Sequence, residues 1–304
     1  MKIVSLLPSA TEIVFALGLG DQLEGVTYEC DFPPEATSKP VVSETALPQD
    51  RLLSPAEIDA MVGGFMGRQE SIYRLDRDLI QRIQPDLILA QDLCRVCAVP
   101  SGQVQDALKE LGCSSQVISL DPHTLEDVWK GIAEVGRATG TEALATELVE
   151  GFRHRIERVR TKAVRLPTIR TLALEWSDPP WIGGHWVPEM VTIAGGTNLL
   201  SEPAQPSRRA GWREIADATP EVIVVMPCGF YLDEAQEQAE RLYAQPDFAG
   251  TSAARNGDVF AVDASSYFSR PGPRLLDGLE ILAWAVHPDS FPRPAADAIA
   301  RVRG

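Results

Sequence analysis

The sequence lacks the features that mark membrane-inserted, exported and nucleic-acid-binding chains. No apolar run approaches the ~20 residues that a membrane-spanning helix needs. The segment Met1–Pro8 has no basic stretch followed by an apolar run and a cleavage site of small residues. Basic residues are also scarce, since 28 Lys and Arg stand against 43 Asp and Glu, a formal net charge of -15. This balance argues against nucleic acids and anionic membrane surfaces as partners.

From these absences we expect no membrane insertion and no nucleic-acid binding. We expect a cytoplasmic location for the chain as written, or a periplasmic or other extracytoplasmic one if a leader was removed.

Cysteine is also scarce, and its spacing is irregular: Cys30, Cys94, Cys97, Cys113 and Cys228. An odd, scattered set does not suit a secreted disulfide framework and is typical of a reducing compartment. Cys94 and Cys97 form a CxxC unit that is half a zinc site, a redox pair or two packed thiols. No second CxxC or CxxH is present. Cys30 would be a third sulfur and Cys228 a remote fourth.

Signatures of catalysis are missing as well. Gly18-Leu19-Gly20 follows an expected helix instead of preceding one, so it is no dinucleotide fingerprint. The sequence has no phosphate-binding loop, nucleophile elbow or HExxH motif. We therefore expect a non-enzyme with no catalytic residue, no metal and no required cofactor.

What the sequence does contain is a weak internal duplication. The expected strands are 2–7, 87–90 and 116–120 in the first half, and 171–174, 222–226 and 258–262 in the second. The expected helices are 13–17, after a turn at 8–12, and 79–84 in the first half, and 188–194 and 212–219 in the second. Alternating strands and helices indicate parallel sheets. We predict an α/β protein of two similar lobes with mainly parallel sheets.

A long helical stretch, 124–163, separates the two halves, and Gly140 is expected to break it. Beyond the break, apolar residues recur every three or four positions: Leu144, Leu148, Phe152, Ile156 and Val159. Such a stripe is typical of core packing, and also of a rigid α-helix that joins two lobes. We expect an N-terminal α/β lobe at 1–123, a helical region with the inter-lobe helix at 124–166, and a C-terminal α/β lobe at 167–304.

Residues 44–76 have no counterpart in the second half. Ser54-Pro55-Ala56-Glu57 predicts a helix start, and Gly63–Gly67 predicts a turn. The segment is interpreted as a lid or as an edge decoration.

Ligands of open parallel sheets bind beyond the carboxyl ends of the strands. That rule selects the loops 8–12, 27–32, 91–97, 175–186, 227–231 and 264–270. These loops are rich in aromatic residues: Tyr28, Phe32, Trp176, Trp181, Trp186, Phe230, Tyr231, Tyr267 and Phe268. Loops are usually polar, so the set predicts a wall for a large, flat, partly apolar ligand. The alternative for any single Trp is packing against the core. His185 lies among them and is the histidine expected to contact the ligand.

At this point the chain resembles the cobalamin-binding type of substrate-binding protein of ATP-driven importers, the group with a rigid helix between two lobes. The resemblance covers nearly the whole chain. It is carried by Leu7–Glu12, Tyr28–Pro34, Pro85–Ile88, Asp178–Gly184, Gly195–Leu199 and Ser269–Arg274. No single segment is specific, but their order is specific for the fold.

The resemblance implies non-catalytic binding of a corrinoid in the inter-lobe cleft, for uptake, storage or delivery. It implies that Tyr28, Trp176, Trp181 and Tyr267 flank the ring, and that Ser9, Asp31, Asp92, Ser266 and Arg270 bond its amides. It also implies docking on an importer permease through one acidic residue per lobe, Asp78 and Glu214. A cytoplasmic member would instead serve a corrinoid-handling protein. We expect a monomer.

The full set of predicted ligand-binding residues is Ser9, Tyr28, Cys30, Asp31, Asp92, Cys94, Cys97, Trp176, Trp181, His185, Phe230, Tyr267, Phe268 and Arg270. Two alternatives stay open. The ligand is heme or a ferric siderophore, or the chain is a metal- or thiol-dependent enzyme that uses Cys30, Cys94 and Cys97.

Overall fold

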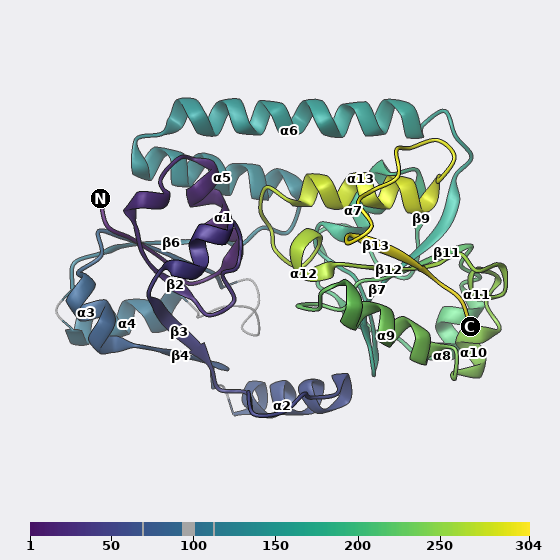
Figure 1. Ribbon diagram of the computed structural model, residues 1–304, viewed down its shortest axis with the longest axis horizontal. Coiled ribbons are helices and arrows are strands. Elements are labelled where there is room, and N and C mark those ends of the chain that lie inside the picture. The colour runs from purple at the N-terminus through teal and green to yellow at the C-terminus, as the bar shows by residue number, and fades with distance from the viewer. Residues whose placement is uncertain (69, 93–100, 112) are drawn as a thin grey trace. The chain divides into compact units, whose positions relative to one another are not determined.

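The chain folds into two compact units, each with its own sheet and helices (Figure 1). The computed structural model describes residues 1–68, 70–92, 101–111 and 113–304. Unit 1 comprises residues 1–122 and 126–149, and unit 2 comprises 123–125 and 150–304. Both are α/β, and parallel strands form the centre of each sheet, which confirms the predicted fold class. No helix in the described ranges is long and apolar enough to cross a membrane.

Unit 1 is built on a six-stranded sheet of order β4-β3-β2-β1-β5-β6. Its strands are β1 (Ile3–Ser5), β2 (Leu23–Thr27), β3 (Val41–Thr45), β4 (Tyr73–Leu75), β5 (Leu87–Ala90) and β6 (Gln116–Ser119). Neighbours are parallel except β3 and β4. Every residue of β1 and β5 is buried, as expected for parallel strands covered on both faces.

The helices of unit 1 are α1 (Pro8–Ala16), α2 (Pro55–Gly67), α3 (Arg77–Ile83), α4 (Ser101–Leu111) and most of α5 (Leu125–Thr139), with 3-10 turns at Gly20–Gln22 and Pro34–Ser38. Two predicted turns are wrong. Residues 8–12 form the start of α1, because Pro8 occupies the first helical turn, where its missing N–H costs nothing. Gly63–Gly67 lies inside α2, which the Ser54–Glu57 capping box starts.

Unit 2 is built on a seven-stranded sheet of order β10-β8-β7-β11-β12-β13, with β9 also paired to β7. Its strands are β7 (Ile169–Ser177), β8 (Pro180–Ile182), β9 (Gly196–Asn198), β10 (Arg208–Arg209), β11 (Val222–Val225), β12 (Val259–Val262) and β13 (Ile299–Val302). The neighbours β7, β11 and β12 are parallel, as are β1, β5 and β6 in unit 1. The internal duplication therefore corresponds to a repeated three-strand core.

The helices of unit 2 are α7 (Val187–Ile193), α8 (Trp212–Asp217), α9 (Leu232–Leu242), α10 (Pro246–Ala249), α11 (Ser252–Asn256), α12 (Ala264–Tyr267) and α13 (Leu275–Val286). One core cluster joins β7, β11 and β12 to α9, and Phe248, which belongs to it, is fully buried. Trp212 and Tyr243 pack edge-on against the Phe248 ring, at 5.9 and 5.4 Å between ring centroids.

Helix α6 (Glu142–Ala163) begins in unit 1 and continues into unit 2. Gly140 separates it from α5 with a φ of 69°, which confirms the predicted break. The predicted apolar stripe is shifted by one residue at its start, because Leu144 is 49% exposed. Ala145 and Val149 are buried instead, and the stripe then follows Phe152, Ile156 and Val159 as predicted.

A buried histidine at the end of α13 makes unit 2 sensitive to acid. His287 is 8% exposed, and no atom of the described residues bonds to its Nε2. It packs near Gly195 and Phe291. Burial lowers the pKa of His287 below its ordinary value of 6.5. The unfolded chain therefore takes up this proton at a higher pH than the folded chain does.

We expect this group to leave stability intact above pH 6.5 and to reduce it as the pH falls from there toward the lowered pKa. His287→Leu removes the proton site, so its Tm should fall less than that of the wild type between pH 7.5 and pH 5. Thermal unfolding of both proteins across this range measures the difference. Parallel curves would contradict the prediction.

Candidate functional site

A row of side chains lies at the carboxyl ends of the strands in unit 2. Trp176 is the penultimate residue of β7, and Phe230 follows the parallel strand β11; their ring centroids lie 5.3 Å apart, edge to face. Trp181 on β8 lies opposite Trp176 in antiparallel register, and Arg209 on β10 lies opposite Trp181. Residues directly opposite each other share one face of a sheet. We call Phe230, Trp176, Trp181 and Arg209 the aromatic row.

The aromatic row keeps part of its ring surface exposed. Its three rings are half-buried, so each keeps surface available for stacking. The Arg209 guanidinium carbon lies 5.2 Å from the centre of the Trp181 ring, a cation–π contact that positions a positive charge at the end of the row.

Arg270 lies at the carboxyl end of β12, in the loop after α12. Its side chain is 7% exposed and donates to the Ser265 hydroxyl at 3.2 Å and to the Tyr231 hydroxyl at 3.5 Å. These hydroxyls hold the guanidinium in place. A fixed guanidinium is a strong donor for carbonyl or carboxylate oxygens of a ligand.

Tyr267 and Phe268 have different surroundings. Tyr267 is half-buried beneath the Arg274 guanidinium, and burial followed by the charge of Asp263 raises its pKa. Phe268 is 2% exposed, so its ring lies in the core. Its carbonyl accepts from the Trp186 indole at 3.0 Å. Ser266 is also buried, and its backbone N–H is capped by Asp263.

His185 lies in the loop between β8 and α7, at a φ of 52°. Its ring centroid lies 5.7 Å from that of His123, and burial followed by the charge of His123 lowers the pKa of His185. The neighbouring carboxyl of Glu175 accepts from Ser207 Oγ at 2.7 Å. Burial raises the pKa of Glu175. These polar contacts tie the loop behind Trp176 and Trp181 to β7.

Unit 1 presents an aromatic pair at the carboxyl end of β2. Tyr28 is 39% exposed, and its ring centroid lies 6.3 Å from that of Tyr73 on β4. The Tyr73 hydroxyl donates to Glu29 Oε2 at 3.2 Å. Burial, and then the negative charge of Glu29, raise the pKa of Tyr28, so its hydroxyl remains a hydrogen-bond donor at neutral pH.

The other predicted residues of unit 1 are more enclosed. Ser9 on α1 is 2% exposed, and Cys30 is 5% exposed with its Sγ 3.0 Å from Thr11 Oγ1. Asp31 is half-buried in the loop after β2. Asp92 follows β5, where Ser119 Oγ donates to its Oδ2 at 3.0 Å. Cys94 and Cys97 lie outside the described residues.

The two predicted docking residues lie on exposed helices. Asp78 is in the first turn of α3. Glu214 is in the first turn of α8, where Arg208 donates to it at 2.6 Å and lowers its pKa. Both carboxylates are exposed. Within the described ranges, no three His, Cys, Asp or Glu side chains lie close enough together to hold a metal ion.

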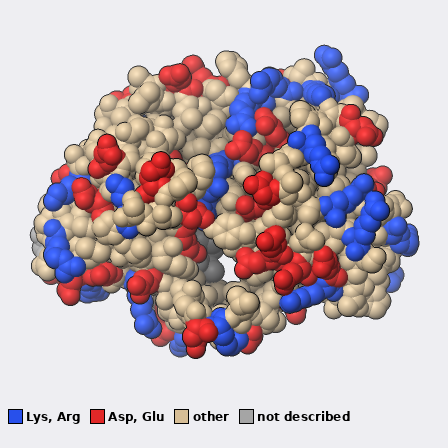
Figure 2. Space-filling view, viewed as in Figure 1, with Lys and Arg blue, Asp and Glu red and all other residues tan. Residues whose placement is uncertain are grey.

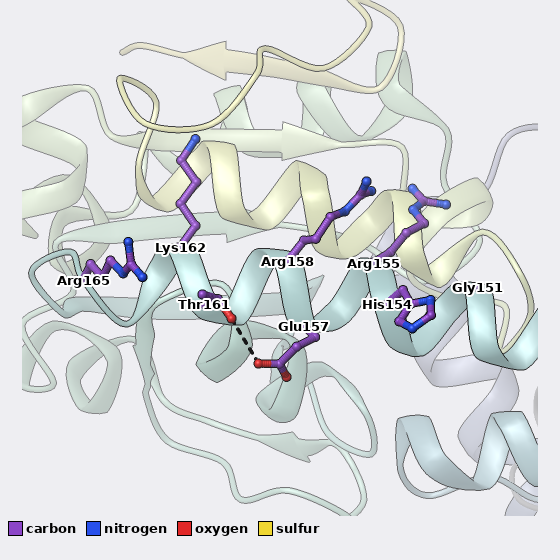
Figure 3. A pocket seen from close by; sticks show the side chains of 8 residues that line it. All are labelled: Gly151, His154, Arg155, Glu157, Arg158, Thr161, Lys162 and Arg165. Carbon is purple, nitrogen blue, oxygen red and sulfur yellow. Dashed lines mark hydrogen bonds between the residues drawn. The ribbon is translucent and has the colours of Figure 1, made fainter.

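A shallow hollow of about 790 Å³ lies away from these strand ends, on α6 (Figure 3). Its lining comes from one face of α6, with Arg155, Arg158 and Lys162, and from Arg165 just after the helix. Figure 2 shows Lys and Arg side chains gathered over this C-terminal half of α6. A molecule here would be covered on one side only, so we do not place the ligand on this face.

Sequence reasoning missed four residues near the strand ends: Tyr73, Glu175, Arg209 and Ser265. Tyr73 and Arg209 lie on short edge strands with no visible alternation. Glu175 and Ser265 lie inside loops that the sequence analysis had selected. The carboxyl group next to Trp176 and the hydroxyl group in the loop of Arg270 were the signals that could have identified them.

The chain has two α/β units with a repeated parallel core, and loops with aromatic side chains follow the carboxyl ends of their strands. This is the architecture of a substrate-binding protein. The model of the family described as "Periplasmic binding protein" matches residues 3–265, and the chain belongs to that family.

Relatives and solved structures agree with this membership. The chain is 25% identical over 296 residues to an uncharacterized ABC transporter substrate-binding lipoprotein, YvrC, of Bacillus subtilis, covering 95% of this chain and 81% of that one. It is 26% identical over 285 residues to a vitamin B12-binding protein of Vibrio cholerae, covering 92% and 86%.

Among structures, the periplasmic vitamin B12 binding protein BtuF of Vibrio cholerae has a TM-score of 0.68 at 24% identity, covering 94% and 96% of the two chains. A periplasmic heme binding protein from Pseudomonas aeruginosa has a TM-score of 0.74 at 20% identity, covering 100% and 99%. These likenesses show the fold. The family is named for the periplasm, so the cytoplasmic location expected from the sequence gains no support.

Proposed function

We propose that this protein is the non-catalytic, extracytoplasmic substrate-binding component of an ATP-driven importer, and that its ligand is a corrinoid. The loaded protein docks on a permease through the exposed carboxylates of Asp78 and Glu214.

The aromatic row is the observation that carries this proposal. Phe230, Trp176 and Trp181 offer three half-buried rings along three adjoining segments, a length of aromatic surface that suits a wide macrocycle better than a small solute. A corrinoid also carries amides around its edge. Arg270, held by two hydroxyls, is a donor for the oxygens of such amides.

Relatives in the family support a tetrapyrrole-type ligand. Proteins named for vitamin B12 binding match over most of this chain at 26% identity, which favours a corrinoid. Structural neighbours named for heme binding have the same fold, so heme is the competing ligand for the test.

Calorimetric titration with cyanocobalamin, paired with visible spectra, tests the proposal. We expect one-site binding with a Kd of about 1 μM or tighter, since a ligand of this size buries a large aromatic contact. Hemin and a ferric siderophore, titrated under the same conditions, are the comparison ligands. No heat and no spectral change with millimolar cyanocobalamin would refute corrinoid binding, and tight binding of hemin alone would replace it.

A further inference from the structure

Helix α2 begins with strong local signals. Ser54 Oγ accepts from the Glu57 backbone N–H at 3.3 Å, and Glu57 Oε2 accepts from the Ser54 backbone N–H at 2.8 Å. Pro55 follows at the first helical position. This capping box fixes where the helix starts without help from the rest of unit 1.

The same helix has an apolar stripe with little to pack against. Ile58, Met61, Val62 and Phe65 recur at the spacing of one helix face, yet all four are only half-buried. Pro55 is the one residue of α2 that is fully buried. The helix makes no extensive contact with the described strands and helices of unit 1.

A helix of this kind is marginal when it is alone. A 13-residue helix depends on tertiary packing for most of its stability. Gly63 and Gly64 weaken it further, because glycine is among the poorest helix formers. The stripe therefore needs an apolar partner for α2 to be firmly held.

The stripe is continuous with the predicted ligand wall of unit 1. Phe65, at its end, packs on the core cluster that contains Ile72 and Tyr73. Tyr73 in turn contacts Tyr28 at 6.3 Å between ring centroids. The segment leaves the sheet at the carboxyl end of β3 and returns into β4, and Ala46 N–H bonds the Ile72 carbonyl at 2.6 Å where its two ends meet.

We propose that Ile58, Met61 and Val62 form an additional ligand-contacting surface, which packs on the apolar part of the ligand held at Tyr28. Ligand binding thereby stabilises helix α2. This inference rests on the proposed function. The ligand that covers the stripe is a large, partly apolar ring, because the stripe extends the aromatic wall at Tyr28 and Tyr73. Burying the apolar side chains of the stripe against such a ring removes their surface from water, which is favourable.

Affinity is the first test. The triple variant Ile58→Ser/Met61→Ser/Val62→Ser removes the stripe but keeps Phe65 and the capping box. We expect its Kd for cyanocobalamin to rise about tenfold or more, since three apolar contacts are lost. Leu52→Ser is the matched control, because Leu52 belongs to the same segment, lies outside the stripe and is 92% exposed. Its Kd should equal that of the wild type.

Proteolysis is the second test, and it reports on α2 directly. Arg51 and Arg68 flank the helix, with side chains 50% and 56% exposed, so trypsin can cut at both ends. Saturating cyanocobalamin should slow cleavage at Arg51 and Arg68 at least about fivefold in the wild type, because the firmed helix opens less often. It should not do so in the triple variant.

The outcomes separate the two proposals. If the wild type binds cyanocobalamin and the triple variant binds equally well with the same protection, the stripe inference is wrong and the proposed function stands. If sedimentation shows a wild-type dimer that the triple variant loses at unchanged Kd, a second copy covers the stripe and the inference is also wrong. If the wild type binds no cyanocobalamin, both proposals fail.

Discussion

Replacing both Trp176 and Trp181 with Ala should raise the Kd for cyanocobalamin about 100-fold. The two residues lie opposite each other on β7 and β8, and each is half-buried with ring surface still exposed. Exposed tryptophans at the centre of a contact typically cost about 2 kcal/mol or more when truncated to Ala. The effects of two neighbouring substitutions are not additive, so we expect a total loss of ~2.7 kcal/mol of binding free energy, which corresponds to the 100-fold rise in Kd.

The control is Trp176→Phe/Trp181→Phe, which keeps an aromatic surface and should recover most of the affinity. Thermal unfolding in the absence of ligand checks that the Ala variant still folds. A Kd within threefold of the wild type for the folded Ala variant would show that the aromatic row is not the ligand surface.

The fold was predictable where the sequence pattern is local. The strand at 87–90 was predicted with its observed bounds, because four consecutive apolar residues follow a proline break. The break at Gly140 was equally clear. The stripe on α6 was displaced at its start because a period of 3.6 admits both Leu144 and Ala145, and only packing selects between them.

The short edge strands were not predictable. β8 is three residues long, begins with Pro180 and lies in a segment that reads as a loop, so it has no alternation to detect. β10 is two residues long. Both exist because they pair with β7 and with each other.

The candidate site was likewise predictable where the signal is local, and not where it depends on contacts between distant residues. The rule for carboxyl ends of parallel strands selected the loops of Trp176, Phe230 and Tyr28 from the sequence alone. The sequence did not reveal that Arg209 lies over Trp181, since that contact joins residues far apart in the chain through an edge pairing. Whether Cys94 and Cys97 take part in binding stays a prediction, since both lie outside the described residues.

Gly184→Ala should destabilise unit 2 by about 3 kcal/mol, because the loop that carries His185 has no room for one methyl group. A Cβ on Gly184 would lie less than 3.0 Å from backbone atoms of Gln205, Pro206 and Ser207. Backbone atoms cannot rotate away as a flexible side chain can, so the Gly184 loop and the segment 205–207 must separate.

Separation breaks the bonds that hold them: His185 N–H to the Gln205 carbonyl at 2.6 Å, Ala204 N–H to the His185 carbonyl at 3.0 Å and Gly184 N–H to Ser207 Oγ at 3.2 Å. Urea unfolding followed by circular dichroism measures the loss. The matched control is Gly151→Ala on α6, where a Cβ meets nothing within 4 Å. There the same substitution should stabilise by up to about 1 kcal/mol, because Ala is the better helix former. An unchanged midpoint for Gly184→Ala would show that the two segments can move apart at little cost. In that event the position of Trp181, three residues before Gly184, would not depend on the close packing between the Gly184 loop and residues 205–207.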